Sequence, residues 1–374
     1  MKIGLVCPYS ITKHGGVLEV VLALQSGLVK KGHDVRVITP APRGSETQEI
    51  ENVIFIGTST DFRSPSHTTT QVSSASDNES VDAILAEEDF DILHFHEPWV
   101  PLLSRQLLQR SQSVNIATFH SKVPEAIMTR TLAKAVNPYL RSVMKYLDVL
   151  TAVSNSGAEY ALNMTEKPIA LIPNGIDLAK YQHPAHKKKD DTKTILFVGR
   201  LEKRKGVKYL LQAYALLAQN NQNIQLQIAG DGPDREKLEL MAEDLKLPNV
   251  SFLGYVSEEM KLDLLEDADV FCSPALYGES FGIVLLEAMA TGTVCVAGNN
   301  SGYSDLMQGT GALSIVNPQD STEFARRLET MLNDDDVRKL WKTWAADYVK
   351  EFSYPKVVDQ YIDLYEDALE QHAK

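Results

Sequence analysis

Two glutamates that flank the start of an apolar stretch are the clearest candidates for chemistry in this sequence. Glu279 precedes Ser280-Phe281-Gly282-Ile283, and Glu287 lies inside the apolar stretch that follows. A helix cap explains the first acid but not a second one within an apolar helix. Backbone N–H groups at a helix start are unpaired and can hold phosphate oxygens, and Glu287 can accept hydrogen bonds from ribose hydroxyls. The motif therefore indicates a site for phosphate and ribose groups.

A basic segment supplies cations that would suit such a ligand. Arg200 follows the apolar run that ends at Val198, and Lys205 comes soon after it, in the sequence Lys203-Arg204-Lys205-Gly206. Arginine can bind a pyrophosphate through two parallel hydrogen bonds, and lysine acts as a point charge. A basic run in a loop is commonly only solvated. Together with the two glutamates, however, this segment indicates a phosphate-binding site.

A glycine pair near the start of the sequence is a weaker signal. Gly15-Gly16 follows the first apolar run and precedes a segment with helical periodicity. Glycines at a strand-to-helix turn let backbone N–H groups approach a phosphate or a sugar. A simple tight turn is the alternative, and the dinucleotide fingerprint G-x-G-x-x-G is absent from the sequence.

Histidines and aspartates raise the question of a metal. His120 ends an apolar run, where it could face a ligand or be a hydrogen-bonded core histidine. His94 and His96 alternate on one face of a predicted strand beside Glu97, but no further ligand is evident. The D-x-D spacing of Asp267–Asp269 falls at a predicted helix end, where capping and packing explain it. We therefore predict no metal site.

Short apolar runs alternate with amphipathic stretches from end to end, which predicts strands that alternate with helices. Because the runs are apolar on both faces, they indicate parallel sheets covered by helices, the α/β class. The predicted strands of the first half are 3–7, 35–39, 53–56, 92–95, 116–119, 149–153 and 169–172, and those of the second half are 195–198, 226–229, 250–253, 270–273, 294–297 and 313–316. The predicted helices include 17–31, 209–219, 235–245, 257–266 and 282–290.

A polar segment divides the two halves. Residues 177–193 contain His183-Pro184 and a lysine run without apolar periodicity, as a solvated linker does. We predict one Rossmann-like domain over 1–176, completed by a C-terminal helix within 356–374, and a second over 177–355. Ligands bind such sheets at the carboxyl ends of their strands. A second polar stretch, 57–78, is dense in serine and threonine and is predicted to be a long mobile loop.

Charge and composition argue against a nucleic-acid-binding protein and against a membrane-spanning one. The 374 residues carry a net charge of −13, which argues against a nucleic-acid-binding protein. The three cysteines share no metal-ligand spacing and lie in apolar runs, as reduced core thiols of a cytosolic protein do. No apolar run is long enough to span a membrane, and the first apolar run is too short for a signal peptide. We expect a cytoplasmic protein, or one peripheral to the inner face of the cell membrane.

These motifs resemble, in type and in order, the retaining glycosyltransferases of family 4, which have the GT-B fold. The resemblance spans nearly the whole chain and rests on Glu279 and Glu287, Gly199-Arg200, Lys205-Gly206, 230–233 (Gly-Asp-Gly-Pro) and 173–177 (Pro-Asn-Gly-Ile-Asp). A closer similarity, to bacterial phosphatidylinositol mannosyltransferases, rests on 7–10, 93–98, 117–121 and 279–285. It implies two Rossmann-like domains whose parallel sheets face each other across a cleft, with the last helix crossing back to the first domain.

The resemblance also implies roles for individual residues. Arg200 and Lys205 would hold the donor pyrophosphate, Glu279 would contact the transferred sugar, and Glu287 would bind the ribose. His120 would lie beside the reacting centre. The remaining implied donor contacts are Gly16, Gly230, Ser280, Phe281, Gly282 and Ile283, and the implied acceptor-side residues are Tyr9, His120 and Lys122. The cations would replace a metal, and no cofactor is expected.

The implied reaction is the retaining transfer of mannose from GDP-mannose to a lipid or polyol such as phosphatidylinositol. The alternatives are a UDP-sugar donor, carrying N-acetylglucosamine or glucose, with a soluble acceptor, a GT-B sugar-nucleotide epimerase, or a binding module without turnover. Residues 57–91 are acidic, whereas Lys134, Arg141 and Lys145 would share one helix face. That face is either simply solvated or contacts an anionic membrane or acceptor.

Overall fold

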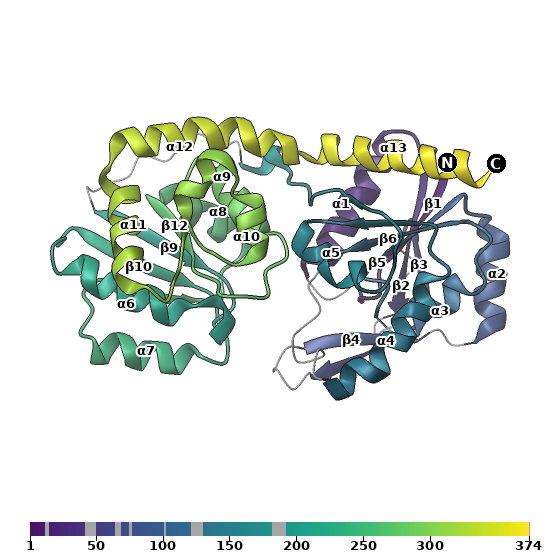
Figure 1. Cartoon of the computed structure of the whole chain (residues 1–374), viewed down its shortest axis with the longest axis horizontal. Coiled ribbons are helices and arrows are strands. Elements are labelled where there is room, and N and C mark those ends of the chain that lie inside the picture. Colours follow the sequence, from purple (N-terminus) through teal and green to yellow (C-terminus); the bar gives the residue numbers. More distant parts are fainter. Residues whose placement is uncertain are drawn as a thin grey trace. The chain divides into compact units, whose positions relative to one another are not determined.

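The chain is described here by a computed structural model that covers residues 1–11, 15–41, 50–63, 69–74, 77–100, 102–120, 130–181 and 192–373. It divides into two compact units (Figure 1). Unit 1 comprises Met1–Gly175 together with Tyr354–Lys374, and unit 2 comprises Ile176–Ser353. The division predicted from the sequence lies between residues 176 and 177, with the return of the chain at 356.

Unit 1 is built on a sheet that, in the described residues, has eight strands in the order β4-β3-β2-β1-β5-β6-β7-β8. All neighbours pair in parallel except β3 and β4. The strands are β1 (Lys2–Val6), β2 (Asp34–Ala41), β3 (Val53–Arg63), β4 (Thr69–Ser74), β5 (Ile92–His96), β6 (Val114–Phe119), β7 (Val149–Ala152) and β8 (Ile169–Leu171). The predicted strands of this half are therefore confirmed, with β4 added.

Helices cover both faces of this sheet. Leu18, Leu24 and their neighbours bring α1 (Gly16–Lys30) into one buried cluster with Ile3 and Leu5. The opposite cluster takes Val81 from α2 (Asn78–Glu88), Leu103 from α3 (Leu103–Leu108), Val143 from α4 (Arg130–Met144) and Ala158 from α5 (Asn155–Leu162). Because side chains of a strand alternate between faces, β1, β5 and β6 each contribute apolar residues to both clusters, as expected for a covered parallel sheet.

The helix α13 (Tyr354–His372) completes the first of these clusters (Figure 1). Its buried residues recur at helical spacing, at Val357, Val358, Tyr361, Tyr365 and Ala368. At Gly27 of α1, an added Cβ would lie 2.4 Å from Cγ2 of Val358, so a glycine lets the two helices approach closely. The expected return of the C-terminal helix to the first domain is confirmed by this packing.

A polar strip lies on the sheet beneath α13. His94 and Thr118 point to the α13 face, since Ile92 and Ile116, two positions earlier on their strands, belong to the same buried cluster. The His94 ring lies 2.7 Å (Nδ1) from the Tyr365 hydroxyl and 2.6 Å (Nε2) from the Thr118 hydroxyl. Burial lowers the pKa of His94 to about 3, so its ring is neutral at neutral pH. The strip thus ties residues on β5 and β6 to the end of the sequence.

The prediction of a long loop over 57–78 is wrong for the residues that the structure describes there. Strand β3 continues to Arg63 and pairs antiparallel with β4, with Thr58 opposite Ser74 and Phe62 opposite Thr70. Threonine is polar, but its branched Cβ favours extended backbone, so a serine- and threonine-rich stretch can form an edge hairpin. Residues 64–68 and 75–76 lie outside the described part of the chain.

Unit 2 is built on a parallel sheet whose described strands follow the order β11-β10-β9-β12-β13-β14. The strands are β9 (Lys193–Val198), β10 (Ile224–Ala229), β11 (Val250–Gly254), β12 (Val270–Ser273), β13 (Val294–Gly298) and β14 (Ile315–Val316). The α-helices are α6 (Val207–Ala218), α7 (Arg235–Asp244), α8 (Glu258–Asp267), α9 (Ile283–Ala290), α10 (Ser301–Leu306), α11 (Ser321–Asn333) and α12 (Asp335–Tyr348), and the 3₁₀ turns are η1 (Leu178–Tyr181), η2 (Lys203–Lys205), η3 (Gly309–Ser314) and η4 (Val349–Phe352). These elements confirm the strands and helices predicted for the second half, except that residues 313–314 of the last predicted strand belong to η3.

N-cap side chains mark the start of several of these helices. Ser257 accepts a hydrogen bond from the Met260 N–H at the start of α8, and Asn300 accepts one from the Tyr303 N–H at the start of α10.

The predicted linker over 177–193 is only partly a linker, because 178–181 form η1 and Lys193 already belongs to β9. Residues 182–191 lie outside the described part of the chain.

We predict that Tyr365→Phe destabilises unit 1 by about 1–3 kcal/mol, because the buried Nδ1 of His94 loses its partner. Urea titration with hydrogen exchange measured at peptides of β5 and α13 reports this free energy for unit 1 alone. Tyr146→Phe is the control, since Tyr146 is exposed in the same unit. Equal effects of the two substitutions would contradict a stabilising role for the polar strip.

Candidate functional site

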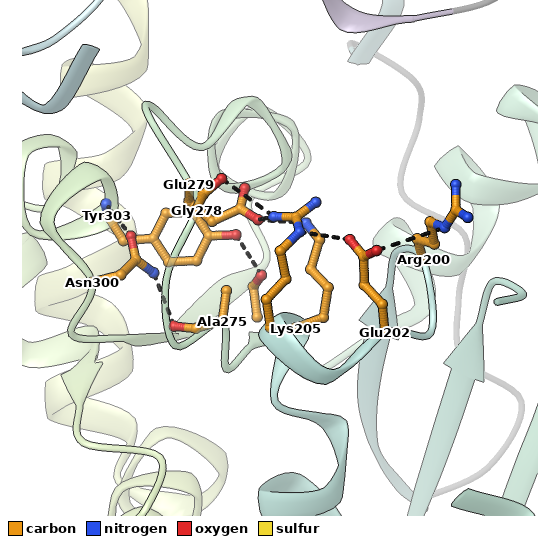
Figure 2. A network of polar contacts seen from close by, with 10 residues as sticks. Arg200, Glu202, Lys205, Ala275, Gly278, Glu279, Asn300 and Tyr303 are labelled. Carbon is orange, nitrogen blue, oxygen red and sulfur yellow. Dashed lines mark hydrogen bonds and ion pairs between the residues drawn. The ribbon is translucent and has the colours of Figure 1, made fainter. Parts of the chain in front are cut away.

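A carboxylate shared by two cations forms the centre of the candidate site in unit 2 (Figure 2). Glu279 lies in the loop between β12 and α9. Its Oε1 is 2.8 Å from Lys205 Nζ and also accepts a hydrogen bond from Arg204 Nη1. The side chains of Lys205 and Glu279 are only 13% and 14% exposed, so water screens this ion pair weakly. The structure therefore brings the predicted residues Lys205 and Glu279 into direct contact.

A second carboxylate extends this network towards Arg200. Glu202 Oε1 accepts a hydrogen bond of 2.6 Å from Arg204 Nε, and its Oε2 lies 3.7 Å from Arg200 Nε (Figure 2). Burial by itself lowers the pKa of Arg204, but Glu279 and Glu202 together raise it above its usual value. The Arg200 side chain is half exposed, which leaves its guanidinium accessible to an anion.

The loop that carries Glu279 is held by close backbone packing on α10. A Cβ at Gly302 would lie 2.3 Å from the Glu279 carbonyl oxygen, so a glycine is required for this approach. Asn300 Nδ2 donates to the Ala275 carbonyl at 2.9 Å, and the Tyr303 hydroxyl lies 2.8 Å from Ser273 Oγ (Figure 2). These contacts order the loop independently of a ligand.

Helix α9 begins directly after this loop. Gly282 is its N-cap and has φ +110°, a conformation that L side chains rarely adopt. Ser280 and Phe281 are buried beside it, and Ile283 is the first residue of the helix. As at every helix start, the N–H groups of the first turn have no intrahelical acceptor, and the helix dipole favours an anion there. The predicted segment Ser280–Ile283 thus lies at a helix start, a position that favours an anion.

Glu287 lies within α9 in a separate polar pair. Its Oε1 accepts hydrogen bonds from Lys261 Nζ at 2.9 Å and from the Tyr181 hydroxyl at 3.2 Å. Burial raises the pKa of Glu287, and the Lys261 charge partly opposes that rise. A buried acid that keeps a cationic partner is suited to accept hydrogen bonds from hydroxyl groups.

Gly230 packs closely against the backbone of Gly199, which precedes Arg200. Its φ is +134°, and a Cβ there would lie 1.9 Å from the Gly199 carbonyl oxygen. Gly199 N–H donates to Ala229 O at 3.0 Å, and Leu201 N–H donates to Asp231 O at 2.9 Å. Gly230 therefore fixes the backbone that carries Arg200 at the carboxyl ends of β9 and β10.

His120 is the centre of the candidate site in unit 1. It directly follows β6 and is buried, with Nε2 2.8 Å from His96 Nδ1 and its N–H donating to Glu97 Oε1 at 3.0 Å. Burial lowers the pKa of His120 to about 4, so the ring is neutral at neutral pH. Asn174 opposes this shift from close by, although its Oδ1 makes no hydrogen bond of ordinary geometry among the described residues.

The other residues predicted in the first half are only partly placed. Burial and the Glu97 carboxylate raise the pKa of Tyr9, which puts Tyr9 near the residue that holds His120. Gly16 opens α1 and is exposed, with open space where a Cβ would be. Lys122 lies outside the described residues.

Several residues of these networks were missed by the sequence analysis. Arg204, Glu202, Lys261 and Tyr181 each contact a predicted site residue. Arg204 lies in the basic run 203–205 and Glu202 directly precedes it, but a run of like residues does not tell which base pairs with which acid. Lys261 and Tyr181 are distant in sequence from Glu287 and carry no local signal.

The two patterns that suggested a metal are accounted for by other contacts. His94 is bonded to Tyr365 and Thr118, and Asp269 Oδ2 accepts a hydrogen bond from the Thr194 N–H at 2.8 Å. In the part of the chain that the structure describes, no group of three or more His, Cys, Asp or Glu side chains could hold a metal ion. Asp269 of the D-x-D pattern thus bonds to the backbone of β9, and Asp267 is the last residue of α8.

Comparison with known proteins gives consistent matches over both units. Residues 14–180 match the family model described as Glycosyltransferase Family 4, and residues 180–347 match that of Glycosyl transferases group 1. The chain is 32% identical to a phosphatidyl-myo-inositol mannosyltransferase of Mycolicibacterium smegmatis, over 98% of this chain and 94% of that protein.

Solved structures with the same fold include a glycosyltransferase of Rickettsia africae, with a TM-score of 0.75 at 18% identity, covering 98% of both chains. They also include Anabaena HepE in complex with UDP-glucose, with a TM-score of 0.74 at 17% identity, covering 98% of this chain and 100% of that one. The two Rossmann-like units are those of the GT-B fold. From the family matches and the identity over nearly its full length, the chain belongs to the family 4 glycosyltransferases.

Proposed function

We propose that this glycosyltransferase moves mannose from GDP-mannose to an inositol lipid, or to a related polyol, with retention of configuration and without a metal ion. The observation that carries the proposal is the pairing of Glu279 with Lys205 and Arg204, next to the exposed Arg200 and the start of α9. Cations, a helix start and the carboxylate that we propose to bind the sugar lie in one loop cluster.

The donor diphosphate is proposed to bind between Arg200, Lys205 and the first turn of α9. As the sugar leaves, negative charge builds on the diphosphate, and fixed cations and N–H groups stabilise that charge. Lys205 then exchanges part of its contact with Glu279 for a phosphate oxygen. Glu279 is thereby released to accept hydrogen bonds from sugar hydroxyls, and Glu287 accepts those of the ribose.

Retention is proposed to occur on one face of the sugar. A double displacement would need a carboxylate nucleophile on the opposite face, and Glu279 and Glu287 are both engaged by cations. In the front-face alternative, the bond from C1 to the diphosphate oxygen breaks while the acceptor oxygen bonds to C1 from the same side. The acceptor proton passes to the departing diphosphate oxygen, so the step balances.

The acceptor is proposed from the relatives. The M. smegmatis relative is named for transfer to phosphatidyl-myo-inositol, and the two chains match over almost their full lengths. A UDP-sugar donor with a soluble acceptor is the second candidate, since the similarly folded HepE was solved with UDP-glucose. The presence of both Glu279 and Glu287, together with His120, favours a transferase over an epimerase or a binding module without turnover.

Membrane contact is proposed through the basic end of α4. Arg141 and Lys145 are exposed, and α4 ends at Met144, so Lys145 follows the helix rather than belonging to it. The side chain of Lys134 lies outside the described residues. The acidic α2 is bound by the ion pair Arg110–Asp82 (3.0 Å) and repels an anionic surface. No helix of the described chain is long and apolar enough to cross a bilayer.

We expect turnover of GDP-mannose with phosphatidylinositol in the presence of EDTA, because Arg200 and Lys205 supply the positive charge. Proton NMR of the first product should show the α-anomer from the α-linked donor. UDP-glucose and UDP-N-acetylglucosamine serve as comparison donors. Loss of turnover on chelation, restored by magnesium, would contradict metal independence, and a β product would contradict retention.

Arg200→Ala and Lys205→Ala should each lower kcat/KM by about 10²–10³-fold, the loss typical of one oxyanion-stabilising donor. Lys203→Ala is the matched control, because Lys203 lies in the same turn and is exposed. Steady-state kinetics measure the loss of kcat/KM, and isothermal titration measures the affinity for the donor. Donor affinity equal to wild type in both variants would remove these residues from the diphosphate site.

Binding to anionic liposomes should be weak and salt-sensitive, at about 1 kcal/mol for each basic residue near the surface. A Lys134/Arg141/Lys145 triple alanine variant should lose it in a flotation assay. A Lys237/Lys246/Lys339 triple alanine variant removes the same charge from exposed positions of unit 2 and should still bind. If wild type ignores the liposomes at low salt and turns over a soluble polyol, the lipid acceptor is wrong.

A further inference from the structure

We propose that His96 is a positioning residue that fixes the tautomer of His120, so that His120 presents an N–H at Nδ1 to an oxygen of the bound substrate. The proposal rests on the proposed function, in which His120 lies beside the reacting centre. It assigns to His96, a fully buried residue of β5, a task that its strand neighbour His94 does not share.

The geometry around His96 is that of a side chain held between two other imidazoles. His94, His96 and His120 lie on the same face of neighbouring strands, with ring centroids 4.3 Å apart for the first pair and 5.0 Å for the second. Both ring nitrogens of His94 are occupied by Tyr365 and Thr118. The polar contact of His96 is therefore with His120, between Nδ1 and Nε2, at 2.8 Å.

One of these two nitrogens donates and the other accepts, because each neutral imidazole carries a single proton. Burial keeps both rings neutral by lowering their pKa values. Among the described residues, Nε2 of His96 has no hydrogen-bond partner and is buried. A proton on that atom would be a buried N–H without an acceptor, which is less tolerated than an unused lone pair.

The proton of His96 therefore lies on Nδ1, and His96 donates to Nε2 of His120. His120 is left with its own proton on Nδ1. The nearby Asn174 agrees with this assignment, since its Oδ1 is a hydrogen-bond acceptor whose influence favours a proton on the His120 ring. In the bound state, a substrate oxygen would take the place of Asn174 as the acceptor of the His120 N–H.

The backbone of His120 is fixed by a different contact. Its N–H donates to Glu97 Oε1, and Glu97 itself has φ +52°, an uncommon conformation for a non-glycine residue. Glu97 thus sets where the His120 backbone lies, while His96 sets which ring atom carries the proton. Removing His96 should change the proton position without moving the strand.

The test is nitrogen-15 NMR of histidine-labelled protein, in which the shifts and couplings of the two ring nitrogens identify the tautomer. The His120 signals are assigned by their loss in His120→Asn. We expect the Nδ1–H form for His120 in wild type and its loss in His96→Leu. Because this measurement needs no substrate, it succeeds or fails independently of the glycosyl transfer reaction. An Nε2–H form of His120 in wild type would overturn the proposal.

Kinetics provide a second readout. His96→Leu should lower kcat by about 10- to 100-fold, as expected for a misdirected reacting group, with the donor KM nearly unchanged. His96→Asn should recover much of this loss, because its amide N–H lies near the position of Nδ1. His94→Gln is the matched control and should lower stability while the His120 tautomer is kept. A wild-type kcat in His96→Leu, or an equal tautomer change in His94→Gln, would contradict the proposal.

Discussion

Parallel pairing constrains where function can reside in this chain, because each crossover returns the chain to the same edge and successive strands end together. In unit 1 the segments after β1, β5 and β6 carry Tyr9, Glu97 and His120. In unit 2 the segments after β9 and β10 carry Arg200 and Gly230, and the loop after β12 leads to Glu279. The strands of both sheets consist mainly of buried apolar residues, so most polar side chains that could bind a ligand lie at these strand ends. The polar strip under α13 is the exception, and there the hydroxyls of Thr118, Thr151, Tyr361 and Tyr365 are hydrogen-bonded.

Charge compensation organises the loops that carry Arg200 and Glu279 in the absence of a ligand. Glu279 and Glu202 are shielded from water and share three cations among them. A buried carboxylate without a cation would be costly, and buried cations would repel one another. A diphosphate bound as proposed would exchange one set of ionic contacts for another. The proposed stabilisation of the leaving group would then need little reorganisation of the loop.

The sequence predicted the strands well because parallel interior strands are continuous apolar runs, whose identity needs no knowledge of their neighbours. It was wrong about 57–78 because threonine is polar by composition yet extended by conformation. The pairing of Glu279 with Lys205 and the role of Arg204 depend on where two loops meet, and spacing alone does not give that. The alternation of His94 and His96 was visible, but their partners, Tyr365 and His120, come from distant segments.

The place of α13 in unit 1 also determines the order in which the chain matures. During synthesis, the residues of Met1–Gly175 leave the ribosome first, but their buried cluster needs Tyr361 and Tyr365, which are made only after the whole of unit 2. Unit 2 is contiguous and has all its parts as soon as residue 353 has been added. The half that begins the chain is therefore the half that is completed last, and its His94 and Thr118 stay without two of their partners until then.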